Sequence, residues 1–204
     1  MWMVAGLGNP GQEHASTRHN VGFDVVNRLA DRASIRLSDK KFKARLGKGD
    51  VMGEPCVLLE PQTYMNLSGE SVGPALGFFK LKTERLLVVH DELELPFGQV
   101  GLKQGGGHGG HNGLRSLKKH LPDDRFVRVR VGIGRPPAGW DPAKFVLGRF
   151  SGEERAEVDP MIDRAVDLVE TILSRGFAHA MNTVNSSGPR AGKPGKTAAR
   201  AAGR

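Results

Sequence analysis

Residues 85–92 read RLLVVHDE, and this stretch decides the fold. Its apolar residues follow one another without polar interruption, which is typical of a central strand buried on both faces of a sheet. A histidine and two acidic residues come directly after the apolar run. We therefore expect helices on both faces of the sheet and a polar site beyond the carboxyl end of this strand.

The segments on either side alternate between strand-like and helix-like patterns. Short apolar runs or strict alternation predict further strands at residues 2–7, 56–60 and 127–133. Apolar residues at helical spacing predict helices at residues 21–33, 66–80, 111–121 and 158–173. This order predicts an α/β fold: a single-domain three-layer sandwich with a mixed, mostly parallel central sheet flanked by helices.

The last of these strands, residues 127–133, places two arginines on one face. Its sequence VRVRVGI alternates strictly, so Arg128 and Arg130 share a side of the strand. Such alternation is typical of a strand with one face toward solvent. We therefore expect a half-buried strand on which Arg130 is exposed.

Length and charge divide the chain into a body and a tail. The 204 residues suffice for one hydrophobic core, and the formal net charge is +8. Residues 185–204 carry basic residues but no acidic and no large apolar ones. We expect a folded domain over residues 1–184 and a basic, disordered tail over residues 185–204. The positive charge suggests a nucleic-acid partner, with a merely solubilising tail as the alternative.

Cysteine content and hydropathy point to the cytoplasm. The single cysteine, Cys56, cannot form an internal disulfide and lies in an apolar run, so we interpret it as a core residue. No apolar stretch is long enough to span a bilayer, and the first residues do not resemble a signal peptide. We expect a cytoplasmic protein without a membrane partner.

Two short motifs match known signatures without the required context. GLGNPG at residues 6–11 fits the dinucleotide-binding pattern, but a polar stretch delays the next helix to about residue 20. GESVG at residues 69–73 fits the serine-hydrolase elbow, with Ser71, Asp91 and His111 in the usual order. No apolar strand leads into Ser71, so a serine nucleophile remains the alternative mechanism rather than the preferred one.

A metal site is the third possibility raised by the sequence. HGGH at residues 108–111, together with His90 and Asp91, offers metal-ligating side chains. Glycines separate the two histidines of the motif, and no second strong pair of ligands is present. We therefore expect neither a metal nor another cofactor.

The residues that remain suit hydrolysis by a histidine base. His19 can take a proton from water near neutral pH if a carboxylate such as Asp91 fixes its tautomer. Asn66 and Asn112 can donate hydrogen bonds to a carbonyl oxygen. The glycines of residues 105–113 permit close approach of a bulky ligand. Asn20 has a simpler interpretation, as a cap of the helix that follows it.

Five motifs together resemble one family. GLGNPG, TRHNVG, MNLSG, VHDELELP and GGGHGGHNGL occur in this order, and the chain from residue 2 to about residue 184 closely resembles bacterial peptidyl-tRNA hydrolase. The resemblance implies an enzyme that cleaves the ester between a peptide and the 3′ end of tRNA, without metal, and so recycles tRNA after abortive translation. It implies peptidyl-tRNA as partner, and we expect a monomer.

The resemblance also assigns the reacting groups. It makes His19 the general base that activates water and Asp91 the residue that orients it. Asn9 and Asn66 resemble the amides that position the substrate carbonyl and the water. A binding protein of the same fold that has lost catalysis is the competing hypothesis, but it would not need this set of residues.

Substrate binding is assigned to residues around this centre. Asn112, with His111 beside it, resembles the part of the family's site that engages the 3′ end of the RNA. Met65 resembles a residue of the peptide groove, and Tyr64 is placed with the substrate-binding residues. His14 stands where the family usually has tyrosine, which adds a titratable group beside the site.

A separate basic pair is assigned to the tRNA end. Lys103 and Arg130 resemble the residues that grip the 5′ phosphate of tRNA. Contacts of this kind add affinity but carry little sequence information.

Overall fold

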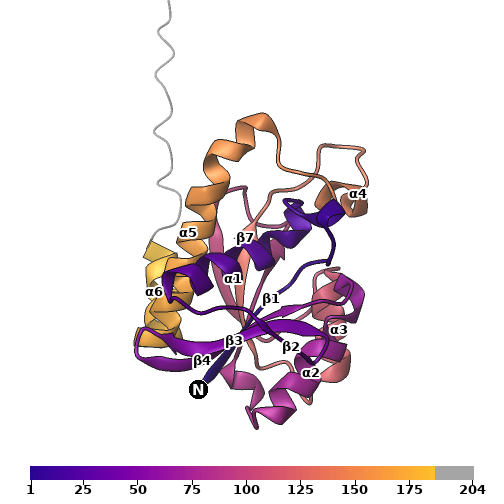
Figure 1. Cartoon of the computed structure of the whole chain (residues 1–204). Helices are drawn as coiled ribbons and strands as arrows, with labels where there is room; N and C mark the ends of the chain where they lie inside the picture. The colour runs from indigo at the N-terminus through magenta and orange to yellow at the C-terminus, as the bar shows by residue number, and fades with distance from the viewer. Residues whose placement is uncertain (187–204) are drawn as a thin grey trace, which may run out of the picture.

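The computed structural model describes residues 1–186 and contains one seven-stranded sheet in the order β2-β3-β4-β1-β5-β7-β6 (Figure 1). The strands are β1 (Trp2–Gly6), β2 (Asp39–Lys41), β3 (Ala44–Val51), β4 (Glu54–Pro61), β5 (Leu86–Glu92), β6 (Val100–Gln104) and β7 (Val127–Gly132). Strands β4, β1, β5 and β7 pair in parallel, whereas β2–β3, β3–β4 and β6–β7 are antiparallel. The predicted mixed sheet is confirmed, with its parallel pairs at the centre.

Helices cover both faces of this sheet and complete the three layers. They are α1 (Val21–Arg32), α2 (Gly69–Phe78), α3 (Asn112–His120), α4 (Pro142–Val146), α5 (Gly152–Arg175) and α6 (Phe177–Ser186). Short 3-10 helices are η1 (Gln12–His14), η2 (Arg18–Asn20), η3 (Met65–Leu67) and η4 (Thr83–Arg85). Helices α1, α5 and α6 pack on one face and α2 and α3 on the other (Figure 1). The predicted basic tail lies, from residue 187 on, outside the described residues.

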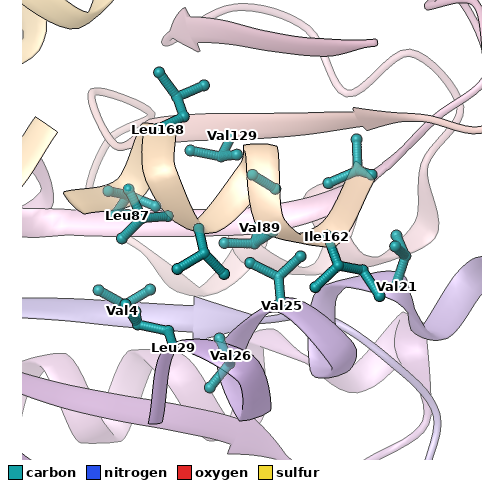
Figure 2. Packing of buried hydrophobic residues seen from close by; sticks show 14 of the residues in the cluster. Val4, Val21, Val25, Val26, Leu29, Leu87, Val89, Val129, Ile162 and Leu168 are labelled. Atoms are coloured by element: carbon teal, nitrogen blue, oxygen red, sulfur yellow. The ribbon is translucent and has the colours of Figure 1, made fainter. Parts of the chain in front are cut away.

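Strand β5 shows why the uninterrupted apolar run predicts the architecture. Leu87 and Val89 point into the core beneath α1 and α5 (Figure 2), whereas Leu86 and Val88 point into the core beneath α2 and α3. All four are fully buried. Both faces of the strand are covered, which favours apolar side chains on each, and the prediction for this strand is confirmed.

The prediction of a half-buried β7 is wrong. Val127, Val129 and Val131 are buried on one face, and Arg128 on the other face is only 2% exposed. The strand has a covered polar face rather than a solvated one, because the guanidinium of Arg128 finds backbone acceptors inside the protein. Arg130 is partly buried, with 25% of its side chain exposed. The alternating sequence therefore correctly predicted that β7 has one apolar and one polar face, but it did not predict that the polar face is covered.

The sequence also left two edge segments without a predicted strand. The hairpin β2–β3 contains charged residues and glycines, and many of its positions are exposed. Strand β6 is short and lies at the other edge. The edge strands β2 and β6 bury little apolar surface, and charged residues and glycines interrupt the apolar residues of β3, so none of the three shows a strand pattern.

Helix α1 approaches the sheet through a glycine. A Cβ atom at Gly22 would lie 2.5 Å from the carbonyl oxygens of Leu7 and Val89, and one at Gly6 would lie 2.1 Å from the oxygen of Gly22. This close approach brings the start of α1, and with it η2, against the carboxyl ends of β1 and β5.

Of the described helices, none combines the length and apolarity that crossing a membrane requires.

Replacing Gly22 with alanine should destabilise the protein by about 1–3 kcal/mol, because the new methyl group would overlap backbone atoms that cannot move independently. Gly77→Ala is the matched control, since nothing lies within 4 Å of a Cβ at that position of α2. That variant should gain about 0.5–1 kcal/mol from reduced chain entropy. Urea unfolding of both variants tests the contrast, and equal midpoints would show that α1 tolerates the methyl group.

Candidate active site

Three segments far apart in the sequence meet beyond the carboxyl ends of β1 and β5. Asp91 stands near the end of β5, His19 lies in η2 just before α1, and His111 directly precedes α3. Sites in open α/β sheets form at this edge because the strands end there and the loops begin. The predicted His19–Asp91 pair is brought together, and His111 joins it.

One carboxylate oxygen holds both imidazoles. His19 Nδ1 lies 2.8 Å from Asp91 Oδ1, and His111 Nε2 lies 2.9 Å from the same oxygen. Asp91 is only 3% exposed. Burial alone would raise the pKa of Asp91, but the attraction and hydrogen bonds of His111 and His19 outweigh it and hold the pKa well below its usual range. The carboxylate is therefore a fixed negative charge.

The hydrogen bonds of His111 determine where its proton lies. Its Nδ1 accepts the backbone N–H groups of Gly113 and Leu114, at 3.1 and 3.3 Å, and so caps the first turn of α3. An acceptor nitrogen carries a lone pair and no hydrogen. The proton of the neutral ring is thus assigned to Nε2, which donates to Asp91. The N-terminus of a helix selects this tautomer.

His19 has the opposite arrangement. With Asp91 ionised, His19 Nδ1–H is the donor of the 2.8 Å hydrogen bond, and Nε2 is left with a free lone pair. The rings of His19 and His111 lie with centroids 5.0 Å apart. Because Asp91 already accepts a second N–H, from His111, it orients His19 without being a ready acceptor for the His19 proton.

The neighbouring His90 is a buried neutral histidine. Its Nδ1 bonds to the backbone oxygen of Asp91 at 2.7 Å, and its ring meets that of His111 edge-on at 4.9 Å. Burial is the main cause that lowers the pKa of His90 to about 3. The ring therefore stays uncharged and packs against the ring of His111. It does not contribute to the metal site considered from the sequence.

A different group of side chains meets the geometric requirement for a metal. Among the described residues, ligand atoms of His19, Asp91 and His111 lie within 4.8 Å of one another. His111 is a poor member of such a set. A metal on Nε2 would take the second lone pair of a ring whose Nδ1 already accepts two N–H bonds, which requires an imidazolate anion. The hydrogen-bond pattern fits proton chemistry better than coordination.

Asn9 is positioned by Asn20, a role that the sequence did not reveal. Asn20 Oδ1 accepts the backbone N–H of Asn9 at 2.8 Å, and Asn20 Nδ2 donates to the Asn9 backbone oxygen at 2.9 Å. The expectation that Asn20 caps α1 is wrong, because its side chain makes no capping bond. Asn9 Oδ1 accepts from Met65 N at 2.7 Å, which leaves Asn9 Nδ2 as a free donor among the described residues.

Two adjoining cavities open on these groups. The larger, of about 750 Å³, is lined by the predicted residues Asn9, His14, His19, Tyr64, Met65, Asn66 and Asn112. The smaller, of about 490 Å³, is lined by His19, Asp91, His111 and Asn112, together with residues 108–110 and 141–143. His14 meets Tyr64 edge-on, with ring centroids 6.3 Å apart. His19 and Asn112 border both cavities, so a ligand that fills both would pass the free nitrogen of His19.

Helix α3 adds residues to the larger cavity that sequence analysis missed. Arg115, Ser116, Lys119 and His120 line it alongside Asn112. The sequence could have indicated this, because Arg115, Ser116 and Lys119 follow Asn112 at spacings of three, four and seven residues. Residues at these spacings lie on the same face of a helix. The polar face of this helix carries cations into the cavity.

Arg128 fastens the glycine-rich segment to the sheet. Its Nη1 and Nη2 donate to the backbone oxygens of Gly107 and Gly106, at 2.6 and 2.7 Å. Gly109 and Gly110 beyond this anchor adopt positive φ angles of 54° and 82°, which side chains disfavour. The segment is therefore anchored at one end and free to approach a ligand where it borders the smaller cavity.

The predicted phosphate-binding pair lies away from both cavities. Lys103 on β6 is exposed, and Arg130 on β7 is 3.7 Å from Glu92. In the β6–β7 register Lys103 is opposite Arg128, and Arg130 is opposite Gly101. Opposed residues of antiparallel strands share a face, so Lys103 and Arg130 point to the same side of the sheet.

The two alternative motifs do not form sites. Ser71 lies fully buried inside α2, and its hydroxyl has no hydrogen-bond partner among the described residues. A nucleophile needs access and a base, so the serine-hydrolase alternative is not supported. The segment at residues 6–11 is followed by η1 and η2 before α1 begins at Val21, so no helix opens on its glycines.

Known proteins share both this sequence and this fold. A family model described as peptidyl-tRNA hydrolase matches residues 3–192. Peptidyl-tRNA hydrolase from Anaeromyxobacter sp. (strain K) is 52% identical over 185 residues, which cover 91% of this chain and 96% of the relative. The relative from Geotalea daltonii is 51% identical over 184 residues, with coverage of 90% and 96%.

A solved structure agrees in three dimensions. The crystal structure of peptidyl-tRNA hydrolase from Acinetobacter baumannii matches with a TM-score of 0.84 and 43% identity, over 91% of this chain and 95% of that one. Matches of this identity and coverage extend over the whole sheet and the segments that carry the site. The chain therefore belongs to the peptidyl-tRNA hydrolase family and is an enzyme of the hydrolase class.

Proposed function

We propose that this enzyme hydrolyses the ester between peptide and tRNA in peptidyl-tRNA and so recycles tRNA after abortive translation. One observation carries the proposal. The free Nε2 of His19, with Nδ1 held 2.8 Å from Asp91, borders a cavity of about 750 Å³ that amide side chains also line. The names of the relatives supply the substrate class.

The proposed mechanism uses His19 as general base. Its Nε2 removes a proton from water as the oxygen attacks the ester carbonyl, and Asp91 stabilises the imidazolium that forms. Asn9 Nδ2 and the amide of Asn66 donate to the carbonyl oxygen, where negative charge develops. The tetrahedral intermediate then expels the 3′ oxygen of the tRNA, which takes the proton from His19. A peptide carboxylic acid, which then loses its proton to water, and free tRNA result.

This chemistry needs neither metal nor cofactor. The tautomer of His111 supports that part of the proposal, because its two ring nitrogens are both engaged in hydrogen bonds. We further propose that residues 1–184 form the catalytic domain, and that the enzyme works as a monomer in the cytoplasm. No membrane association is part of the proposal.

The substrate would extend through both cavities. Met65, Tyr64 and His14 lie in the larger cavity, where they would contact the peptide. Asn112 borders both cavities, beside the glycine-rich segment, where it would contact the 3′ end of the RNA. Lys103 and Arg130 would hold the 5′ phosphate at the sheet edge.

Release of peptide from N-blocked aminoacyl-tRNA tests the function directly. Wild-type protein should cleave this substrate with and without EDTA. His19→Ala should abolish turnover, because no base remains to deprotonate the water. The same variant should still bind tRNA. Absence of cleavage by wild type would favour the RNA-binding protein without catalysis. Loss of cleavage with EDTA would favour the alternative hypothesis of a metal site.

Replacing His111 with asparagine separates its two hydrogen-bonding roles. Asparagine can still cap α3 but cannot reach Asp91, so one N–H to a buried carboxylate is lost. We expect kcat to fall about 10-fold to 100-fold with stability near that of wild type. His111→Ala should lose the cap as well and unfold more easily, by about 1 kcal/mol. An unchanged kcat for the asparagine variant would show that Asp91 needs only His19.

Neutralising the proposed phosphate clamp should weaken substrate binding without affecting chemistry. For Lys103→Gln and Arg130→Gln we expect a higher KM, a nearly unchanged kcat and a salt slope lower by about 1 for each contact removed. Arg155→Gln is the control, since this exposed cation on α5 has no ion pair among the described residues. A salt dependence equal to that of wild type in both variants would refute the clamp.

A further inference from the structure

A second basic surface lies at the edge of the sheet opposite to β6. It combines aromatic rings and lysines from the β2–β3 hairpin and from the end of α2. We call it the aromatic–lysine patch. Its members are Phe42, Phe78 and Phe79, with Lys41, Lys48, Lys80 and Lys82.

The three rings form one cluster with an open side. Phe78 lies 5.1 Å from both Phe42 and Phe79 between ring centroids, and Phe42 and Phe79 are 6.2 Å apart. Phe42 and Phe79 are half-buried, but Phe78 is 60% exposed. An exposed ring that is held in place by two others is a prearranged surface on which a planar group can stack.

The backbone presents these side chains at positions that usually carry other residues. Lys41 pairs with Ala44, so Phe42 and Lys43 form a two-residue hairpin turn. Their φ angles are 55° and 53°, and that of Lys80 is 52°. Such turns favour asparagine and glycine, because a side chain is strained at positive φ. Phenylalanine and lysine do not stabilise turns of this kind. Their presence here therefore points to a role for the side chains themselves.

The lysines of the patch carry uncompensated charge. Within residues 1–186, Lys41, Lys80 and Lys82 form no ion pair, and the adjacent Lys43 pairs with Glu70 at 2.7 Å. Lys48 lies over the ring of Phe79, with Nζ 5.1 Å from the ring centroid. The surface therefore offers positive charge around exposed π faces, which is the combination that binds RNA backbones and unstacked bases.

The rings of the patch are on the same side of the sheet as the basic residues of α3. Helix α2, which ends at Phe78, packs beside α3, whose Arg115 and Lys119 line the larger cavity. The proposed clamp on β6 and β7 lies at the far edge, roughly 30 Å away at about 4.8 Å per strand. One face of the protein thus carries cations from edge to edge.

We infer that the aromatic–lysine patch is a second RNA-binding site, which takes a phosphate backbone on its lysines and stacks an unpaired base on Phe78. Only the choice of RNA as occupant rests on the proposed function, whose substrate is an RNA. The occupant is a separate single-stranded RNA segment, because stacking on Phe78 requires a base that is not paired with a second strand. A lipid surface fits less well, because a single exposed ring offers little apolar area for insertion.

Binding measurements with the full chain test this site independently of catalysis. The probes are deacylated tRNA and a fluorescent single-stranded RNA oligonucleotide, and the variants are Phe78→Ala and the double variant Lys80→Gln with Lys82→Gln. We expect affinity to fall about 5-fold or more for Phe78→Ala, and the salt slope to fall by about 1 per lysine. Met52→Ala, at an exposed position of the β3–β4 turn, and Arg155→Gln should bind like wild type.

The outcomes separate the two sources of RNA and the failure of the proposal. Weakened oligonucleotide binding supports the single-stranded segment as the occupant. Weakened binding of tRNA alone would overturn that choice, because the patch would then hold the body of the substrate. Photo-crosslinking of 4-thiouridine RNA to the peptide that contains Phe78 should accompany either result. Unchanged affinity for both probes would overturn the inference, as would binding of anionic lipid vesicles that depends on Phe78 when RNA binding does not. Failure of the proposed function would appear instead as absence of peptide release by wild type.

Discussion

A single carboxylate oxygen connects the parts of this active site. Asp91 Oδ1 accepts N–H groups from His19 and His111, which lie in segments before α1 and α3. The backbone oxygen of the same residue bonds His90. A buried negative charge is destabilising unless hydrogen bonds compensate it. Moving either histidine away from Asp91 would therefore destabilise the protein. Asp91 thereby fixes the relative positions of the two helices that border the site.

The fold also sets the protonation pattern on which the proposed chemistry depends. The first turn of α3 places two N–H groups on His111 Nδ1, which directs the His111 proton to Asp91. His19 consequently presents an unprotonated Nε2 to the cavity. On the other side of α3, Arg128 anchors the glycine-rich segment through the oxygens of Gly106 and Gly107. A helix terminus and a buried arginine thus arrange the site without touching the substrate.

Cations and catalytic groups are divided between different parts of the molecule. Asn9, His19 and Asp91 lie buried where strands end, whereas Asn66 is exposed in η3. The basic side chains proposed to bind RNA lie on the surface at both edges of the sheet, and those of α3 line the larger cavity. This division suits an RNA substrate, because affinity comes from many exposed phosphate contacts and reaction rate from a few fixed groups.

The sequence by itself determined the layers of the fold and the residues at the strand end. Continuous apolar runs such as residues 86–89 require cover on both faces, and motifs in a fixed order identified His19 and Asp91 as candidates. It did not predict the edge strands β2 and β6, which bury little apolar surface, nor β3, whose apolar residues are interrupted by charged residues and glycines.

Only the tertiary structure decided the partners of the polar residues. Arg128 is spaced like a solvent-facing residue yet is buried, and Asn20 stands at a helix start yet bonds the backbone of Asn9. His111 caps a helix and holds Asp91 at once. Hydrogen bonds join residues that are distant in the chain, and their geometry follows from packing rather than from local sequence. Apolar burial can be inferred from sequence periodicity, whereas the pairing of polar groups requires the folded chain.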